Sequence, residues 1–227
     1  LKNKISVQSH RKTGYFFQKV AEFLTNSKQD EIFVLKGYAG TGKTTVISTL
    51  VNNLLEINKK YVLLAPTGRA AKVIANYSNK PAHTIHKKIY YPKTKGGGVS
   101  FTTQQNKHKN TIFIVDESSM ISDSSSDSSM YENGSLLDDL IYYVYSGTNC
   151  KMILLGDTAQ LPPVNLDVSP ALDIDLLSRN YDMEISHIEF DEVMRQEENS
   201  GILFNATELR EQLNDDFYED FKFDVKN

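Results

Sequence analysis

The chain has little cysteine and no long apolar run. Its 227 residues include one cysteine, Cys150, and no tryptophan. A lone cysteine cannot form an internal disulfide and fits a reducing compartment, so we expect a cytoplasmic protein. No apolar run approaches the roughly 20 residues that span a bilayer, and the opening stretch, LKNKISVQSH, lacks the apolar segment of a signal peptide. We therefore expect no membrane partner.

Acidic residues are absent from a long internal stretch. No Asp or Glu occurs from Ile57 to Val115, where eleven Lys or Arg residues lie. The whole chain has a net charge of −4, so the remainder of the chain carries −15. Charges that cluster by sign in this way indicate one basic face, which would suit a polyanionic partner. A lysine-rich surface that contacts only solvent is the alternative interpretation.

Short apolar runs alternate with segments of helical periodicity. The runs IFVL, YVLL, IFIV and MILL are typical of strands that are buried on both faces. Apolar residues at three-and-four spacing predict helices between these strands, at residues 14–26, 44–60, 69–78 and 135–147. This alternation predicts an α/β fold in which a parallel sheet has helices on both faces.

Two stretches interrupt this pattern, and the composition changes again near the end. Residues 88–110 are rich in Gly, Thr and Lys and are expected to form a small inserted β-hairpin. Residues 122–135 have low complexity and are expected to form a flexible loop. Past Asp182 the chain becomes acidic, and we expect short helical pieces such as ATELREQL. We divide the chain into a main domain, 1–205, and the start of a truncated second region, 206–227.

The segment GYAGTGKTT matches the phosphate-loop pattern G-x-x-x-x-G-K-[ST] between a predicted strand and a predicted helix. Glycines let successive backbone N–H groups surround an anion, and the helix N-terminus adds a partial positive charge. Lys43 would reach the β- and γ-phosphates, and the Thr44 hydroxyl would bind Mg²⁺. A chance match in a glycine-rich turn is the alternative. The candidate nucleotide-binding residues are Gly37, Gly40, Thr41, Gly42, Lys43, Thr44 and Thr45.

The segment IFIVDESS supplies two carboxylates directly after a predicted strand. A phosphate-loop enzyme needs a carboxylate there to hold the Mg²⁺ water shell, and Asp116 is in that place. Glu117 follows it, where a base could orient and deprotonate an attacking water. An Asp-Glu pair after a strand is also a common way to begin a helix. The phosphate loop in the same chain favours the catalytic interpretation.

The segment LLGDTAQLPPV follows another predicted strand and contains two prolines. Proline lacks an N–H and fixes φ, so the strand cannot continue and a stiff loop must follow. If this strand is parallel to the other two, Gln160 reaches the crevice at their carboxyl ends, where ligands bind in open α/β sheets. A rigid amide in that place could sense the γ-phosphate.

These segments, in this order, resemble the first motor domain of superfamily-one DNA helicases of the RecD-like branch, which translocate 5′→3′. GYAGTGKT is similar to motif I, LLAPTGRAAKVI to motif Ia, AHTIHK to the Thr-Ile-His segment, IVDESSM to motif II, LLGDTAQLPPV to motif III and FDEVMRQ to motif IV. The resemblance covers roughly residues 13–210. It implies a RecA-like P-loop domain that binds ATP and Mg²⁺.

The resemblance also implies a path for single-stranded DNA. By this likeness the contacts come from Thr67, Arg69, Thr84 and His86. The predicted hairpin, with Lys93 and Lys95, occupies the place of the family's strand-separating hairpin. All these residues lie inside the acid-free stretch. For His86 and its neighbour in the motif, His83, a helix-cap or packing role is the alternative.

Some features of the family have a weaker match or none. Arg195 corresponds to a γ-phosphate-contacting arginine, although it could instead pair with its acidic neighbours. The adenine-reading glutamine has its nearest counterpart in Gln18, displaced by a few residues. The second motor domain, with its arginine finger, has no counterpart in the chain. We therefore expect this chain alone to be a poor motor. Separately, we expect a monomer.

Taken together, the sequence predicts the N-terminal motor domain of an ATP-dependent DNA helicase, a class that serves DNA repair and recombination. Two alternatives stay open. A nucleotide-dependent switch or scaffold would keep the fold without the motor activity. A phosphate-loop kinase would share the nucleotide site but would leave GDTAQLPP unexplained. Stimulation of ATP turnover by single-stranded DNA separates the motor from both.

Overall fold

A computed structural model describes residues 15–190, apart from residues 39, 96–97, 124–130 and 165. These residues belong to one compact unit of the chain, Leu1–Val193. The predicted helical piece ATELREQL lies outside them, as does part of the predicted loop 122–135. Within the described ranges, no helix is long and apolar enough to cross a membrane.

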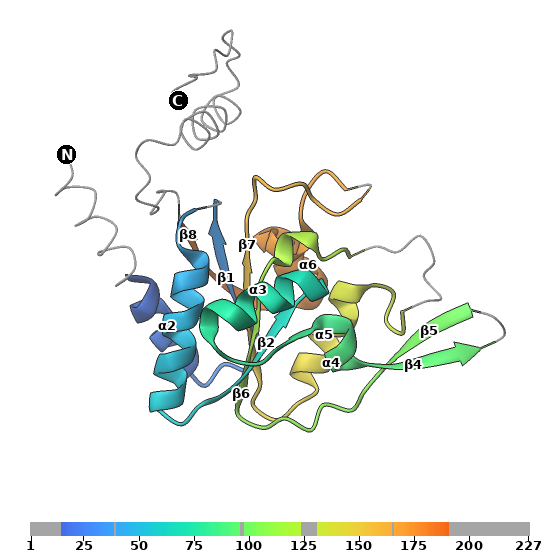
Figure 1. The fold of residues 1–227 in the computed structure, drawn as a ribbon, viewed down its shortest axis with the longest axis horizontal. Helices are drawn as coiled ribbons and strands as arrows, with labels where there is room; N and C mark the ends of the chain where they lie inside the picture. Colours follow the sequence, from blue (N-terminus) through green and yellow to red (C-terminus); the bar gives the residue numbers. More distant parts are fainter. Residues whose placement is uncertain (1–14, 39, 96–97, 124–130, 165, 191–227) are drawn as a thin grey trace, which may run out of the picture. The chain divides into compact units, whose positions relative to one another are not determined.

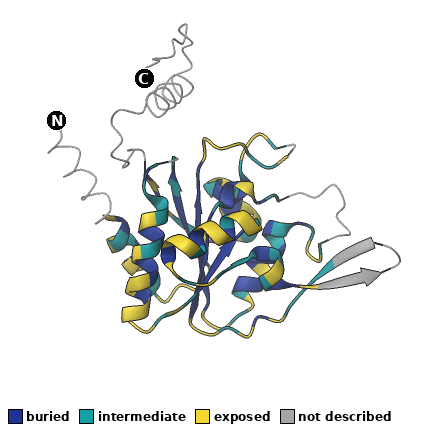
Figure 2. Cartoon of the chain, viewed as in Figure 1, coloured by how far each residue is buried: buried dark blue, intermediate teal, exposed yellow. Residues whose placement is uncertain are grey.

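The centre of the unit is a six-stranded sheet in which every neighbouring pair is parallel (Figure 1). The strand order is β3-β2-β6-β7-β1-β8. Strands β6 and β7 are buried along their whole length, and β1 at every position except Lys36, because helices cover both faces of the sheet (Figure 2). The strands are β1 Glu31–Gly37, β2 Lys60–Ala65, β3 Ala82–Thr84, β6 Thr111–Val115, β7 Lys151–Gly156 and β8 Glu184–Phe190.

Each face of the sheet has its own apolar core. On one face, Phe33 and Leu35 pack with a helix at residues 15–25, with α2 (Lys43–Glu56) and with α3 (Gly68–Ser78). On the other face, Ile32 and Val34 belong to the core formed with the remaining helical elements. These elements are α4 Ile85–Ile89, α5 Leu136–Tyr145, α6 Ile174–Tyr181 and the short 3-10 turns η1 Ser118–Met120 and η2 Pro170–Leu172. The predicted α/β fold is confirmed.

Side-chain caps explain where several helices begin. The Thr67 hydroxyl accepts from the backbone N–H of Ala70 at the start of α3. Ser135 caps α5 in the same way, and Asp173 caps α6. A capping oxygen satisfies one of the backbone donors that the first helical turn leaves unpaired. These local sequences therefore fix the residue at which each helix begins.

The inserted hairpin is confirmed, with narrower bounds than predicted. Strands β4 (Tyr90–Lys95) and β5 (Gly98–Thr103) pair in antiparallel fashion, from Tyr90 opposite Thr103 to Lys95 opposite Gly98. In Figure 1 this hairpin extends away from the sheet and its helices.

Some elements differ from the sequence prediction. Helix α2 ends at Glu56 because Asn58 has a φ of 54° and cannot continue a right-handed helix. The acidic stretch after Asp182 begins with the edge strand β8, where only helical pieces were expected. Charged and polar residues occupy the exposed positions of β8, so it lacks the continuous apolar run of the central strands. Strand β3 and helices α4 and α6 are short and were also missed.

Candidate functional site

The predicted nucleotide-binding segments and the predicted DNA contacts Thr67 and Thr84 all lie at the carboxyl ends of the sheet strands. The parallel register aligns the ends of neighbouring strands: Ala65 is opposite Thr84, Leu64 is opposite Val115, and Lys36 is opposite Gly156. The phosphate loop follows β1, the acidic pair follows β6, and the Gln160 loop follows β7, which lies between them. Thr67 follows β2 and Thr84 is the last residue of β3, at the carboxyl ends of the other strands. The sheet therefore places the predicted nucleotide and DNA residues side by side.

The phosphate loop depends on glycine at defined positions. A Cβ at Gly37 would lie 2.8 Å from the Thr41 Oγ1 and 3.1 Å from the Phe190 Cβ, so only glycine fits there. Gly40 and Gly42 have φ values of 84° and 86°, which favour glycine. Thr41 is buried, and both its hydroxyl and its N–H donate to the Tyr38 carbonyl, at 2.8 and 3.2 Å. The Thr41 side chain thus shapes the loop.

Lys43 begins α2 and lies against the loop that precedes it. Its Nζ donates to the carbonyl of Gly37 and, at 2.8 Å, to that of Tyr38. Gly42 caps the helix without a side chain, and no acidic residue lies in the first turn, so the positive end of the helix is not neutralised there. Thr44 is half-buried in this turn and Thr45 is exposed. The turn therefore offers backbone donors and an ammonium group to an anion.

Asp116 and Glu117 lie where β6 ends. The Asp116 N–H donates to the Leu64 carbonyl at 2.9 Å, which continues the sheet by one residue. Burial and the negative charge of Glu117 raise the pKa of Asp116 to about 6, while the charge of Lys43 opposes the shift. Glu117 has a φ of 53°, and its Oε2 is buried without a hydrogen-bond partner in the described structure. These carboxylates are thus held in a site that disfavours bare negative charge.

The loop after β7 is folded onto the same region. The Asp157 Oδ1 accepts from the Ala159 N–H at 2.9 Å, and the Gln160 N–H donates to the Asp157 carbonyl at 3.3 Å. The Asp157 Oδ2 is buried and, among the described residues, has no partner. The Gln160 Oε1 accepts from the Ser119 hydroxyl at 3.2 Å. Gln160 therefore contacts the turn that directly follows Glu117.

These residues fit a magnesium nucleotide. Mg²⁺ prefers carboxylate and hydroxyl oxygens and keeps several waters, so Asp116 and Thr44 supply a suitable donor set. Glu117 and Asp157 each carry one buried oxygen that has no partner among the described residues, and bound water or a hydrated cation would satisfy its hydrogen bonds. The glycine-lined loop and the uncapped helix end suit phosphate.

The other half of the edge carries the predicted DNA contacts. Thr67 and Thr84 are both half-buried and cap helices α3 and α4, so their hydroxyls already accept backbone hydrogen bonds. Arg69 is exposed on the first turn of α3. His86 is half-buried in α4, and burial lowers the pKa of its imidazole. The structure therefore gives the two threonines and His86 structural roles in addition to any contact with DNA.

The remaining predicted residues are placed less fully. Lys93 and Lys95 belong to β4 of the hairpin. Arg195 lies outside the described residues. Gln18 is exposed on the helix at residues 15–25, and its amide donates to Glu22 at 3.3 Å.

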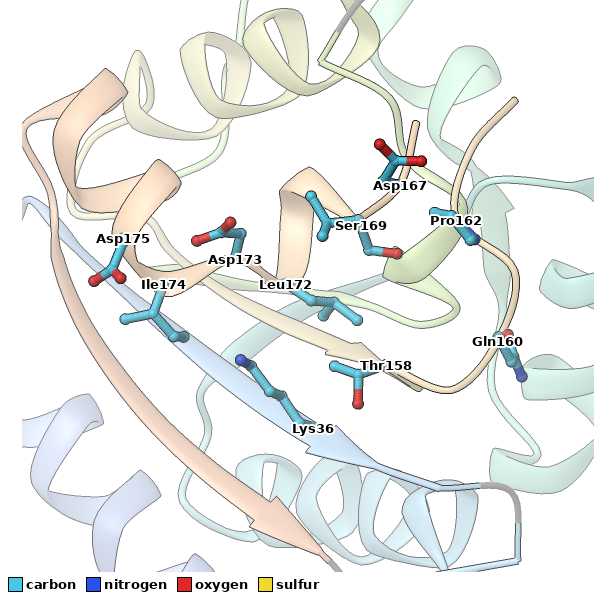
Figure 3. A pocket seen from close by; sticks show the side chains of 11 residues that line it. Lys36, Thr158, Gln160, Pro162, Asp167, Ser169, Leu172, Asp173, Ile174 and Asp175 are labelled. Atoms are coloured by element: carbon cyan, nitrogen blue, oxygen red, sulfur yellow. The ribbon is translucent and has the colours of Figure 1, made fainter. Parts of the chain in front are cut away.

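A cavity of about 350 Å³ adjoins the Gln160 loop on the face that carries α6 (Figure 3). Lys36 of β1 points into it, and the labelled carboxylates of Asp167, Asp173 and Asp175 lie around it. Gln160 lies at one end of the cavity (Figure 3). The residues of the phosphate loop do not line the cavity. Three carboxylates beside one amine disfavour phosphate, so this cavity does not extend the nucleotide site.

The fold and the site define a P-loop NTPase with a RecA-like parallel sheet. The model of the AAA domain family matches residues 21–166, and the chain belongs to this family. The resemblance to RecD-like superfamily-one helicases, first seen in the order of the motifs, is also confirmed by relatives of known name.

Three similar proteins illustrate the comparison. An uncharacterised protein of Acanthamoeba polyphaga mimivirus is 32% identical over 200 residues, which are 78% of this chain and 37% of that protein. The ATP-dependent RecD2 DNA helicase of Deinococcus radiodurans is 29% identical over 152 residues, 65% of this chain and 18% of the helicase. The crystal structure of Pif1 helicase from Bacteroides in complex with ADP-AlF3 and single-stranded DNA has a TM-score of 0.51 at 20% identity, over 88% of this chain and 46% of that one.

Proposed function

We propose that this chain is an ATP-hydrolysing motor domain of a superfamily-one DNA helicase that moves 5′→3′ along single-stranded DNA. The observation that carries the proposal is the arrangement of the sheet edge. The predicted nucleotide residues follow β1, β6 and β7, while the predicted DNA contacts Thr67 and Thr84 lie where the neighbouring strands β2 and β3 end. A change at one group can therefore reach the other through directly paired strands.

The residues after β1 and β6 supply phosphate binding, metal binding and activation of the attacking water. The loop N–H groups and Lys43 hold the phosphates, and Lys43 leaves the loop carbonyls to do so. Thr44 and Asp116 hold Mg²⁺, which when bound neutralises charge that develops on the phosphates. Glu117 orients the attacking water and accepts its proton. Its buried Oε2, which has no partner among the described residues, supports this role.

The contact between Gln160 and Ser119 links nucleotide sensing to the base. Gln160 can bind the γ-phosphate, and its amide oxygen also accepts from the Ser119 hydroxyl. Ser119 lies two residues after Glu117, and its carbonyl accepts from the Ser169 hydroxyl at 2.8 Å. Loss of the γ-phosphate would therefore change a hydrogen-bonded path that leads from the Gln160 loop to η1 and η2.

A complete motor needs more than the described domain. The chain spans 37% of the viral relative and 18% of the Deinococcus helicase. We propose that a second motor domain closes the nucleotide site and supplies an arginine to the transferring phosphoryl group, worth roughly 10³–10⁵ in rate. Without it, one wall of the site faces water, where electrostatic stabilisation is weak. This chain alone should bind nucleotide loosely and turn it over slowly.

The test measures ATP turnover and DNA binding by the same protein. We expect Mg-ATP to bind, and single-stranded DNA to raise its turnover strongly only when a second motor domain is present in the same protein. A nucleotide-dependent switch would bind ATP without this stimulation, and a kinase would transfer the phosphoryl group to a small acceptor. Either outcome would overturn the motor assignment.

The basic stretch gives a separate prediction for DNA. The double variant Lys93→Glu and Lys95→Glu should weaken binding of a single-stranded oligonucleotide, because phosphate contacts dominate such binding. The affinity of the unaltered chain should fall steeply as salt rises, and the slope against log salt should be shallower in the variant. Fluorescence anisotropy measures both. An affinity that does not respond to salt would contradict the proposed DNA contact.

A further inference from the structure

Aromatic rings gather where the hairpin joins the body of the domain. His86 of α4, Tyr90 of β4, Phe101 of β5 and Tyr131 before α5 form what we name the hairpin-base cluster. The ring centroids of Tyr90 and Phe101 are 5.0 Å apart, and those of His86 and Phe101 are 5.2 Å apart. Tyr131 stacks on Phe101 at 5.7 Å with an interplanar angle of 22°. These separations are typical of favourable aromatic pairs.

A buried carboxylate fixes the cluster to α5. Asp139 is fully buried, and its Oδ2 accepts from the Tyr90 hydroxyl at 2.7 Å. Its Oδ1 accepts from the Asn133 N–H at 2.8 Å and from the Asn133 side-chain amide at 2.6 Å. Burial and the Asp139 charge raise the pKa of the Tyr90 hydroxyl, so it remains a donor. A buried carboxylate with several donors is costly to disturb, so this junction is rigid.

Further hydrogen bonds hold both hairpin strands to the flanking segments. The Gln104 side-chain amide donates to the Tyr90 carbonyl at 2.6 Å. The Thr103 N–H and hydroxyl both donate to the Glu132 carboxylate, at 2.6 and 2.5 Å. A ring nitrogen of His86 lies 3.3 Å from the Tyr131 hydroxyl. The segment that carries Tyr131 and Glu132 thus contacts α4 and β5 at once.

The direction of the hairpin depends on this junction. Beyond Tyr90 and Thr103 the two strands pair with each other and extend away from the body (Figure 1). An isolated two-stranded hairpin is only marginally stable, so what aims it is the packing at its base. We propose that the four residues of the hairpin-base cluster are positioning residues, which hold the hairpin in one direction so that it acts as a rigid wedge at a junction of single- and double-stranded DNA. This inference rests on the proposed function.

Helix α4 connects the hairpin to a predicted contact with single-stranded DNA. Thr84, a predicted DNA contact, caps this five-residue helix by accepting from the Lys87 N–H. His86 lies in the first turn of the same helix and packs into the hairpin-base cluster. A single DNA strand bound at Thr84 would therefore lie at a fixed distance from the hairpin. A preorganised wedge avoids the entropy cost of ordering the hairpin when the junction binds.

The experiment compares two DNA probes that have the same single-stranded tail. One is the tail alone and the other is a forked duplex, and fluorescence anisotropy gives the affinity for each at one salt concentration. We expect Tyr131→Leu to lower the preference for the fork roughly three- to tenfold, with the affinity for the tail unchanged. Tyr131→Phe keeps the stacked ring and should behave like the unaltered chain. Tyr142→Leu removes an exposed ring from α5 and is the matched control.

A distance measurement tests the anchor without DNA. Spin labels at Thr94→Cys and the exposed Asn76→Cys, in a chain with Cys150→Ala, report the direction of the hairpin. A narrow distance distribution that broadens in Tyr131→Leu is expected. An unchanged distribution together with an unchanged fork preference would overturn the proposal.

Two other outcomes are also decisive. If no probe binds to the unaltered chain, the proposed function fails, and the distance distribution alone decides whether the cluster anchors the hairpin. If Tyr131→Leu melts the whole domain, Tyr90→Phe replaces it, since this variant keeps the ring and removes the bond to Asp139.

Discussion

Buried polar groups occur at both ends of the central strands, but they are hydrogen-bonded to different extents at the two ends. At the amino ends, Lys151 of β7 and Glu31 of β1 are 4% and 3% exposed and lie 3.7 Å apart. The Lys151 Nζ donates to the Phe23 carbonyl and to the Asn26 Oδ1. Glu31 accepts from Asn26 at 2.7 Å and from a serine of β8 at 2.7 Å. Both carboxylate oxygens of Glu31 are therefore satisfied.

At the carboxyl ends, the half-buried carboxylate of Glu117 and the buried carboxylate of Asp157 differ from Glu31. Each of the two has one buried oxygen that lacks a partner in the described structure, Oε2 of Glu117 and Oδ2 of Asp157. Burying an unpaired polar group costs free energy, so such groups persist where they serve a ligand. The comparison separates a polar network that stabilises the fold from one that is suited to chemistry.

The largest effect is expected at the phosphate loop. Lys43→Ala removes the ammonium group that would pair with the phosphates, and we expect nucleotide affinity to fall by roughly 10³-fold or more. Two of the Lys43 hydrogen bonds reach carbonyls of its own loop, so we expect the thermal midpoint to change less than the nucleotide affinity does. Calorimetry with Mg-ATP measures the first and a thermal melt the second. Unchanged affinity would remove Lys43 from the site.

Glu117→Gln should separate binding from turnover. The amide keeps the shape of the carboxylate but cannot accept a proton, so Mg-ATP should still bind while hydrolysis slows about 10²–10⁴-fold. The measurement is single-turnover hydrolysis in a protein that contains both motor domains. Glu189→Gln, on the partly exposed edge strand β8, is the matched control. A fully active Glu117 variant would exclude the role of base.

Lys151→Met should show the opposite pattern. It leaves Glu31 buried without its cation, which costs about 3–5 kcal/mol of the free energy of unfolding. Nucleotide affinity of the folded protein should not change, because Lys151 lies at the other end of its strand. Lys28→Met is the control, since Lys28 pairs with Glu184 at the exposed surface, where water screens the charge. Urea unfolding gives the free energy of unfolding of each variant. Equal losses in Lys151→Met and Lys28→Met would contradict the expected difference between a buried and an exposed ion pair.

Ser119→Ala tests the smallest effect. It removes the hydroxyl that donates to Gln160, and we expect turnover to fall only a few-fold, since a neutral hydrogen bond contributes about 1 kcal/mol. If the two residues act through this bond, the double variant with Gln160→Ala should be no slower than Gln160→Ala alone. Ser146→Ala, which removes a hydroxyl at the far end of α5, serves as control. Additive losses would show that Ser119 and Gln160 act independently.

Local patterns predicted much of this molecule. The phosphate loop, the acidic pair and the four central strands were recognisable because glycine spacing and continuous apolar runs are local signals. Glu31 and Lys151 could not be paired from the sequence, since their contact depends on the order of the strands. The same holds for Tyr90 and Asp139, which meet only because α5 packs beside α4. Nor did any local signal show that Lys43 would lie on carbonyls of its own loop.

The backbone conformation at Glu117 lowers stability at a residue to which we assign a role in hydrolysis. Six described residues other than glycine have positive φ, and all except Glu117 are Asn or Asp, which tolerate this conformation better. A glycine at this position would relieve roughly 1 kcal/mol of strain. Selection for heat stability alone would therefore favour Glu117→Gly, which, on the proposed role of Glu117, removes the base. On that role, stability and ATP turnover favour different residues at position 117, and a glutamate is expected there only when turnover is selected.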